Sequence, residues 1–416
     1  MPFDARAAQN CTKTTDAQTG IVTTTCALTE NVDASADRFK NDAPENANAE
    51  NLTLVLNKDI EISMPENAAA LTESVVNAGR DAAVNGGFLS VDAENGGDCT
   101  LTVKNIKSAS SDPNYTDAIV FSGYGGAEIN VNFVMENNDA SSSGAGTVFA
   151  ALGNAVFNGT TAFKDNKSGL LFFAAGDTDF NSVKYANAVD AGEALTDYAK
   201  RQYDNRFENN AATIPTGVFS VNGGKKISFA GRTLFKDNTL ATNGESFLTA
   251  ILLAQVDGSF SMARTDFVGN RITADNITDE AEGYGVVHSG ALSGNFTGET
   301  TFQDNVFHIK TATNGGAVYG GAMANARSLN FANATFTGNK ITADNVRGAF
   351  KALGGAYAAL ESSENVFGQD AVFENNQIDV NTGDALGGGL YAAENSTTVF
   401  DASATFKNNS VKTAAV

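Results

Sequence analysis

Few residues in this sequence have side chains that do chemistry on their own. It contains two histidines, His288 and His308, and three cysteines, Cys11, Cys26 and Cys99. No two cysteines have the Cys-x-x-Cys spacing of a structural zinc site. A serine–histidine–aspartate arrangement could use only one of the two histidines. The sequence therefore predicts neither a structural zinc site nor a nucleophilic triad.

The best acidic pair for general acid–base chemistry is Asp177 and Asp179. Glycoside cleavage by paired carboxylates needs two of them within about 5–10 Å of each other. We interpret this pair as solvated acids of a turn, because no clustered acids accompany it. Small or apolar residues fill the outward positions of the strands expected at 147–150, 170–173, 317–320 and 390–393. Calcium-loop, nucleotide-loop and Gly-x-Ser-x-Gly motifs are missing from the sequence, so we predict no enzymatic activity, no cofactor and no metal site.

Charge and hydropathy restrict the partners and the compartment. The 416 residues include 27 Lys and Arg against 48 Asp and Glu, a net charge of −21. This balance argues against binding nucleic acid or an anionic membrane, since both need a basic surface. There is no transmembrane segment of 18 or more apolar residues, and the first 20 residues lack the apolar core of a signal peptide. The chain is either cytosolic or a secreted protein whose signal was removed; the Asn- and Thr-rich, Lys-poor composition favours the second.

One motif, Phe-x-x-Asn, organises most of the chain. Its spacing varies from 28 residues (Phe207 to Phe235) to 44 residues (Phe163 to Phe207). The copies are Phe163 and Asn166, Phe207 and Asn210, Phe235 and Asn238, Phe267 and Asn270, Phe302 and Asn305, Phe336 and Asn339, Phe373 and Asn376, and Phe406 and Asn409. A repeat of this period is typical of a solenoid.

Each repeat reads as short strands separated by Gly, Asn and Asp turns. Glycine density and β-branched and aromatic runs exclude a helical solenoid, and hairpin signals are missing from the repeats. The sequence therefore predicts an all-β, right-handed parallel β-helix with an irregular N-terminal cap and a short helical insertion. In such a fold the Phe side chains stack inside the core. The Asn side chains form a hydrogen-bonded ladder at a corner. A second aromatic column is expected at Phe149, Phe172, His288, Tyr319, Tyr357 and Tyr391.

The domain boundaries follow from this repeat. Residues 1–50 are polar and are predicted to form a cap, in which Cys11 and Cys26 could close a hairpin as a disulfide or remain two unpaired residues. Residues 51–416 are assigned to the β-helix, with regular repeats from about residue 117. The long interval after Phe163 contains an insertion at about 189–206, predicted to be a helix lying on the flank.

The alternation of Phe-x-x-Asn with Gly-Gly-Ala-(Ile/Leu/Val) resembles the polymorphic outer membrane proteins of chlamydiae and similar autotransporter passengers. Gly315-Gly316-Ala317-Val318 matches the glycine motif strictly, and the segments at 354–357 and 387–390 are variants of it. The resemblance implies a secreted β-helix displayed on a Gram-negative surface, often adhesive, usually followed by a translocator barrel. The sequence ends directly after a Phe-x-x-Asn copy, so we expect either a fragment of a longer protein or something that stacks on this end.

The function expected from this resemblance is attachment. We expect a non-enzymatic extracellular or cell-surface protein, adhesin-like, that presents its repeat surface to a ligand on a host or a neighbouring cell. One alternative is a self-assembling structural protein whose copies stack end to end into a filament or layer. The other is a polysaccharide-degrading β-helix enzyme.

Overall fold

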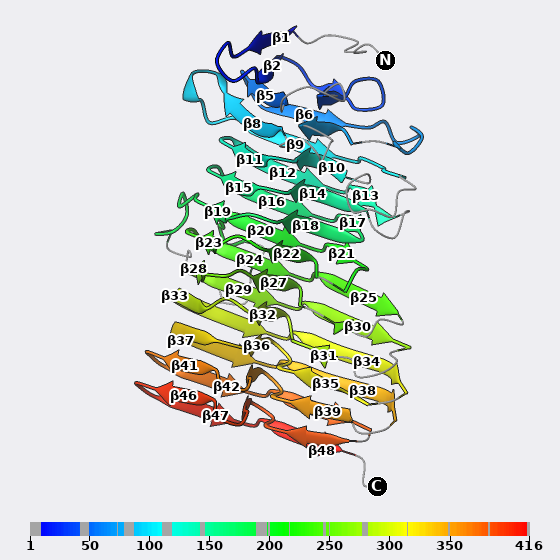
Figure 1. The fold of residues 1–416 in the computed structure, drawn as a ribbon. Helices are drawn as coiled ribbons and strands as arrows, with labels where there is room; N and C mark the ends of the chain where they lie inside the picture. Colours follow the sequence, from blue (N-terminus) through cyan, green and yellow to red (C-terminus); the bar gives the residue numbers. More distant parts are fainter. Residues whose placement is uncertain are drawn as a thin grey trace. The chain divides into compact units, whose positions relative to one another are not determined.

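The computed structural model describes residues 10–41, 50–72, 74–78, 87–109, 119–141, 146–188, 198, 200–215, 217–243, 247–248, 250–276, 282–313, 315–347, 350–381 and 383–413 (Figure 1). The chain divides into two compact units, residues 1–182 and 183–416, and each unit is described by itself.

The first unit is a parallel β-helix preceded by one hairpin. In the hairpin, β1 pairs antiparallel with β2, and Cys11 lies opposite Cys26, to which it is joined by a disulfide. From β2 onward the pairing is parallel. The strands are β1 (Asn10–Thr15), β2 (Val22–Leu28), β3 (Val32–Asp33), β4 (Phe39–Asn41), β5 (Glu50–Leu56), β6 (Ile60–Ser63), β7 (Val76–Ala78), β8 (Phe88–Ala93), β9 (Thr100–Lys104), β10 (Ile119–Gly123), β11 (Gly126–Ile129), β12 (Asn132–Glu136), β13 (Asp139–Ala140), β14 (Thr147–Ala151), β15 (Asn154–Phe157), β16 (Thr161–Lys164), β17 (Lys167–Ser168), β18 (Leu170–Ala174) and β19 (Thr178–Phe180). Parallel stacking thus already includes strands before residue 51.

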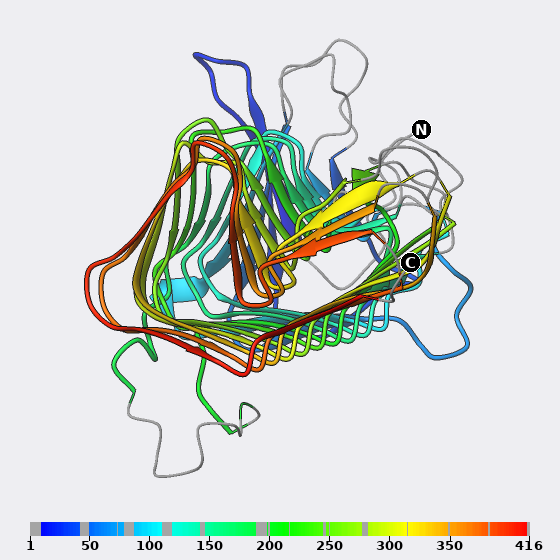
Figure 2. The same cartoon turned by 90° about the horizontal axis from the view of Figure 1, so that it is seen from below.

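The second unit is also a parallel β-helix, and its coils superimpose when viewed along the axis (green to red in Figure 2). Its strands belong to three sheets, one of which holds two strand columns in most coils. These strands are β20 (Asn205–Glu208), β21 (Ala211–Ala212), β22 (Phe219–Asn222), β23 (Lys226–Phe229), β24 (Thr233–Lys236), β25 (Thr239–Asn243), β27 (Leu252–Gln255), β28 (Ser259–Met262), β29 (Thr265–Val268), β30 (Arg271–Asp275), β32 (Val287–Ser289), β33 (Ser293–Gln303), β34 (Val306–Ala312), β36 (Met323–Asn325), β37 (Ser328–Thr337), β38 (Lys340–Val346), β40 (Tyr357–Ala359), β41 (Glu364–Phe367), β42 (Ala371–Glu374), β43 (Gln377–Val380), β45 (Leu390–Ala392), β46 (Thr397–Phe400), β47 (Ala404–Lys407) and β48 (Ser410–Thr413).

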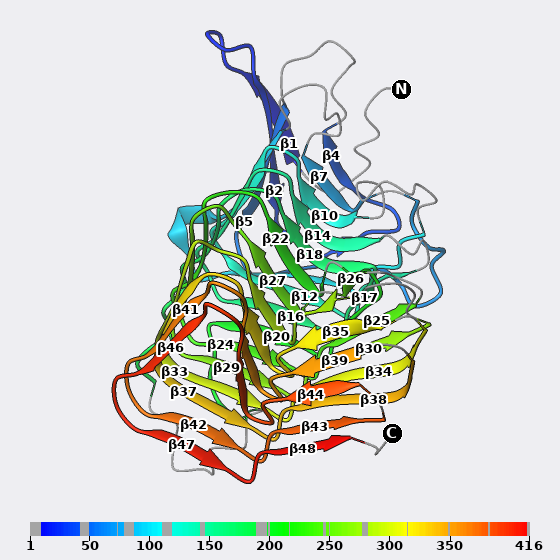
Figure 3. The same ribbon diagram turned by 60° about the horizontal axis from the view of Figure 1, so that its bottom comes forward.

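An additional sheet distinguishes the second unit. Its strands are β26 (Phe247–Leu248), β31 (Glu282–Gly283), β35 (Gly316–Tyr319), β39 (Phe350–Leu353) and β44 (Asp384–Leu386). They pair in parallel in that order, and Figure 3 shows β35, β39 and β44 next to one another. Each later coil of the unit therefore contributes one strand to this sheet in addition to its strands in the other three sheets. The predicted parallel β-helix is confirmed, and the only helical element in the described residues is the single turn η1 (Glu94–Gly96).

Stacked phenylalanines fill the core of the second unit. The rings of Phe267, Phe302 and Phe336 follow one another at centroid distances of 4.8 Å, with interplanar angles of 6° and 0°. Phe296 and Phe331 belong to a second stack, at 4.7 Å and 4°. Parallel pairing puts the same repeat position of each coil directly over the next, which brings identical rings into offset contact.

The asparagine that follows each of these rings forms a buried ladder. The Nδ2 of Asn270 donates to the Oδ1 of Asn305 at 3.0 Å, and the Nδ2 of Asn305 donates to the Oδ1 of Asn339 at 2.9 Å. Each Nδ2 also donates to the carbonyl of the repeat phenylalanine one coil earlier, as Asn305 does to Phe267 at 3.0 Å. The same pattern includes Asn210, Asn238, Asn376 and Asn409, and in the first unit Asn138 bonds to Asn166.

The residue before each ladder asparagine adopts a left-handed backbone conformation. Asp237, Asp304 and Asn375 have φ values of 53°, 53° and 57°, and Gly338 has 68°. Only glycine, asparagine and aspartate enter this region at low cost. The motif is therefore Phe-x-(Asn/Asp/Gly)-Asn, and the third position is the sharp corner that turns the ladder side chain inward.

The expected second aromatic column is wrong in the second unit, whereas in the first unit Phe149 and Phe172 are register partners whose rings stack 5.1 Å apart. In the second unit His288 and Tyr391 fall in one register row, while Tyr357 pairs in register with Met323 and Leu390. Tyr319 lies in the additional sheet, on β35. The Gly-x-x-aromatic spacing precedes strands of two different sheets. Residues that share this spacing therefore need not occupy the same register position in successive coils.

The glycine motif is also displaced. Gly315-Gly316-Ala317-Val318 leads into β35 and does not align with the glycine segments of the next two coils. The residue at the position of Gly354 and Gly387 is Gly320, which is followed by Gly321. Gly320, Gly354 and Gly387 share φ values of 69°, 75° and 70°. A Cβ at Gly320 would meet the Met323 carbonyl oxygen at 1.9 Å, so this turn requires glycine.

Most of the predicted helical insertion, residues 189–197 and 199, lies outside the described residues. Its described part contains turns and, from Asn205, the strand β20, but no helix. Within that described part, Tyr198 packs with Leu234 and Val268 on the outer face of β24 and β29.

Candidate functional site

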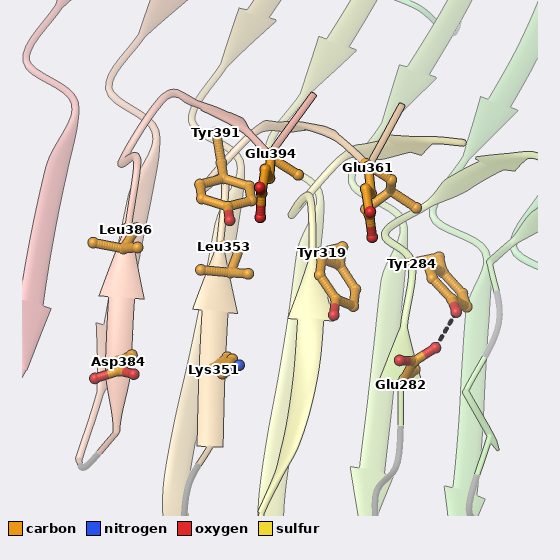
Figure 4. A pocket seen from close by; sticks show the side chains of 12 residues that line it. Glu282, Tyr284, Tyr319, Lys351, Leu353, Glu361, Asp384, Leu386, Tyr391 and Glu394 are labelled. Atoms are coloured by element: carbon orange, nitrogen blue, oxygen red, sulfur yellow. Dashed lines mark hydrogen bonds between the residues drawn. The ribbon is translucent and has the colours of Figure 1, made fainter. Parts of the chain in front are cut away.

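A groove on the second unit runs across the additional sheet and has a volume of about 580 Å³. Its floor is formed by β31, β35, β39 and β44, and its wall by the turns that follow β40 and β45. Figure 4 shows Glu361 and Glu394 projecting from these turns toward the strands that carry Tyr319 and Leu353. The groove lies across the strands, so successive coils each contribute side chains to it.

Two rows of side chains form the floor. Register pairing aligns Glu282, Ala317, Lys351 and Asp384 in a charged row. The residues two positions later, Tyr319, Leu353 and Leu386, form an aromatic and aliphatic row. Tyr284 extends this row, because its ring lies 5.8 Å from that of Tyr319 at an interplanar angle of 15°. Side chains two residues apart on a strand share a face, so both rows face the groove.

The wall repeats from coil to coil. Ala359 of β40 and Ala392 of β45 are register partners. Glu361 and Glu394 each follow two residues later and therefore occupy equivalent positions in adjacent turns. Both side chains are exposed, and Tyr391 lies beside them with its ring partly exposed.

The acids of the groove differ in their contacts. The hydroxyl of Tyr284 donates to the Glu282 carboxylate, and burial together with this contact raises the pKa of Tyr284 above its ordinary value. Burial, and then the charge of Glu282, also raises the pKa of Tyr319. The carboxylates of Glu361, Asp384 and Glu394 make no hydrogen bond or ion pair with the described residues.

His288 lies beneath this aromatic row. Its ring stacks on Tyr284 with centroids 4.3 Å apart, its exposed fraction is 7%, and its Nδ1 has no hydrogen-bond partner among the described residues. Burial lowers the pKa of His288 to about 4. The imidazole is therefore neutral at physiological pH and supports the Tyr284 ring without adding charge.

This shift predicts acid sensitivity of the second unit. The folded pKa of His288 lies below its ordinary value of 6.5, so the stability that neutral burial contributes is present above pH 6.5 and is lost as the pH falls toward 4. The loss is about 3 kcal/mol by pH 4, from ~1.4 kcal/mol for each pKa unit. His288→Phe keeps a stacked ring and removes the titration. Urea unfolding at pH 7 and pH 4 should show a smaller decrease in stability for this variant than for the wild type; equal decreases would contradict the assignment.

A second polar cluster holds the segment before β20 against β29 through Asp266. Arg201 Nη1 lies 3.4 Å from Asp266 Oδ2, and the hydroxyl of Tyr203 donates to the same oxygen at 2.7 Å. Burial raises the pKa of Asp266. Arg201 also covers the ring of Tyr198, with its guanidinium carbon 4.8 Å from the centroid. Each of these polar groups has its partner within the cluster, so we interpret the cluster as structural.

The residues singled out from the sequence are dispersed. Asp177 and Asp179 flank Thr178 on β19 of the first unit and are absent from the groove lining. His308, on β34, contacts Thr342 at 2.8 Å through Nδ1 and Asp344 at 3.5 Å through Nε2. Cys99 is buried with a free thiol.

Of the groove residues, sequence reasoning noticed only Tyr319 and Tyr391, and it placed them in one stacking column. The acids come from β31, β44 and two turns, which lie outside the four strands whose outward positions the sequence predicted. A usable signal existed: Leu360-Glu361 and Ala393-Glu394 follow the same repeat position.

Comparison with known proteins assigns no family. No family model matches the chain, and neither a curated protein nor a solved structure matches it. In the part of the chain that the structure describes, no helix is long and apolar enough to cross a bilayer. Within the same residues, no three His, Cys, Asp or Glu side chains gather closely enough to hold a metal ion.

Proposed function

We propose that the protein is a non-enzymatic attachment protein of the extracellular or cell-surface, autotransporter-passenger type. It binds a ligand on a host or neighbouring cell through the groove of its second unit. The observation that carries this proposal is the groove itself, in which aromatic rings and unpaired carboxylates recur on successive coils. A repeated row of such groups suits an extended ligand better than a compact one.

The scaffold supports this role because it holds the groove in one geometry. Strands β31, β35, β39 and β44 are bonded to one another along their length. A ligand therefore meets side chains that are already positioned, which lowers the entropic cost of binding.

Attachment can be measured with beads coated with the purified protein and counted on cell layers. We expect wild-type beads to adhere. The double variant Glu361→Gln/Glu394→Gln should lose most of this adhesion. The matched control Asp257→Asn/Asp401→Asn also removes two exposed carboxylates but lies outside the groove lining, so it should adhere like the wild type. Equal adhesion of wild-type and uncoated beads would refute the proposal.

Polysaccharide cleavage is a second candidate, because the groove gathers Glu282, Glu361, Asp384 and Glu394 in one lining. Carboxylates on either side of a sugar chain are the groups that glycoside hydrolysis uses. Release of reducing ends from a polysaccharide panel, abolished in Glu361→Gln or Glu394→Gln, would favour this activity over attachment.

Self-assembly is a third candidate. The strands β46, β47 and β48 pair on one side only within the described residues, and Phe406 on β47 is 52% exposed. Light scattering of the purified protein distinguishes this candidate, because a monodisperse monomer at high concentration would exclude it.

A further inference from the structure

We propose that the groove binds an extended chain carrying primary ammonium groups, namely a lysine-rich segment of a partner protein. This inference rests on the proposed attachment function and specifies its ligand. It is carried by three properties of the groove lining: its charge, its unpaired carboxylates and its exposed aromatic faces.

The charge of the lining is strongly one-sided. Four carboxylates, of Glu282, Glu361, Asp384 and Glu394, face the groove, whereas among the described lining residues only Lys351 has a cationic side chain. The walls of a groove concentrate such a field, so cationic ligands are attracted and anionic ones repelled. A nucleic acid, an acidic peptide or a sulfated glycan therefore does not fit this lining.

Three of these carboxylates, those of Glu361, Asp384 and Glu394, are also unpaired among the described residues, in contrast to equivalent acids elsewhere in the same unit. Glu374 and Asp379 each pair with the lysine in register on the next coil, Lys407 at 2.7 Å and Lys412 at 3.2 Å. Lys351 and Asp384 are likewise register partners, yet no ion pair joins them in the structure's described part. Glu361 and Glu394 likewise have no lysine partner among the residues that the structure describes. The groove thus keeps free the acceptors that ammonium groups would use.

The aromatic side chains add a second mode of recognition for the same ligand. Tyr319 and Tyr391 are partly exposed in the lining, and Leu353 and Leu386 lie in the same row as Tyr319. A tyrosine face attracts an ammonium group, and the methylene stem of lysine packs on apolar surface. A lysine side chain matches both features, with its stem on the row of Leu and Tyr and its head group at the carboxylates.

The balance of donors and acceptors disfavours a neutral sugar. The donors of the lining's side chains are the Lys351 ammonium and the tyrosine hydroxyls, and that of Tyr284 is already engaged with Glu282. A sugar hydroxyl both donates and accepts, so it would leave several carboxylates poorly compensated. An ammonium group is donor-only and carries the opposite charge, which satisfies the same oxygens.

The length of the groove suits a short peptide segment. Four strands form its floor, and parallel strands lie about 4.8 Å apart, so the first and last are separated by roughly 14 Å. An extended peptide rises about 3.3 Å per residue, which places about four residues along the floor. A lysine-rich stretch of that length can present ammonium groups to both Glu361 and Glu394.

The test is a titration of fluorescently labelled pentalysine with the whole protein, followed by fluorescence anisotropy. We expect saturable binding that weakens as salt increases. Glu361→Gln/Glu394→Gln should weaken binding by about tenfold or more, and Lys351→Gln should strengthen it by about threefold, since a like charge is removed. Asp257→Asn/Asp401→Asn, which leaves the same net charge as the Glu double variant, should bind like the wild type. Far-UV circular dichroism establishes that each variant is folded.

Each outcome decides a specific point. Equal weakening in the two double variants would mean attraction by net charge alone and would overturn the site. Preference for a neutral oligosaccharide such as cellopentaose would overturn the ligand class, and so would binding of spermine without binding of pentalysine. If pentalysine fails to bind while the groove variant still abolishes bead adhesion, this inference fails and the attachment function stands. If pentalysine binds and beads do not adhere, the attachment function fails.

Discussion

Replacing Phe302 by alanine is expected to lower the free energy of unfolding by about 4 kcal/mol, since truncating a buried phenylalanine costs roughly 3–5 kcal/mol. The ring lies between Phe267 and Phe336, 4.8 Å from each, and meets the edge of Phe296 at 6.2 Å. Its loss leaves a cavity in the middle of the stack, and the ladder on either side prevents the coils from closing on it. The shift of the urea midpoint, measured by far-UV circular dichroism, tests this expectation.

The matched control is the same motif position in another coil. Phe406 stacks on Phe373 at 4.8 Å but is 52% exposed. Truncation there removes about half as much buried apolar surface and leaves no closed cavity, so Phe406→Ala should cost about 1 kcal/mol. Similar losses for the two variants would show that stacking within the core is not what stabilises the coil.

Asn305→Ala should be equally damaging, for a different reason. The side chain donates to Asn339 Oδ1 and to the Phe267 carbonyl, and its Oδ1 accepts from the backbone N–H and the Nδ2 of Asn270, both at 3.0 Å. Alanine leaves these buried groups without partners, at about 1–3 kcal/mol each before relaxation. We therefore expect a loss of about 4 kcal/mol, measured by the same urea titration.

Two further variants separate the ladder from asparagine content in general. Asn305→Asp preserves shape but turns the donor that faces the Phe267 carbonyl into an acceptor, so it should be no better than alanine. Asn330 donates to Asn295 at 3.0 Å on the exposed face, and Asn330→Ala should change stability by less than about 0.5 kcal/mol. A stable Asn305→Asp protein would contradict the ladder as the reason for the motif.

The parts of the fold that could be predicted from sequence are those in which every coil repeats the same residue for the same reason. Phe302 and Asn305 recur because each needs an identical neighbour above and below. The left-handed turn at Asp304 could also be predicted, because the residue before each ladder asparagine is always Asn, Asp or Gly. The sequence analysis did not include this restriction on residue type.

A strand was expected at 317–320, but it could not be assigned to a separate sheet because the outward row of the additional sheet carries no repeated residue. Glu282, Ala317, Lys351 and Asp384 are register partners with four different side chains. Glu282, Lys351 and Asp384 are partly or fully exposed, so packing restricts their residue type little. The candidate site therefore lies at positions whose residues do not repeat from coil to coil. Only the register pairing of the strands shows that these residues form rows.

The asparagine ladder has one sense throughout the second unit. Each ladder amide from Asn210 to Asn376 donates one N–H to the next asparagine toward the C-terminus, so these side-chain bonds run in one direction and reinforce one another. Because every bond of this line runs in the same direction, whole coils can be added or removed without reversing any bond. Removal of part of a coil would interrupt the line. Evolution by duplication or deletion of this protein should therefore proceed in steps of one complete turn.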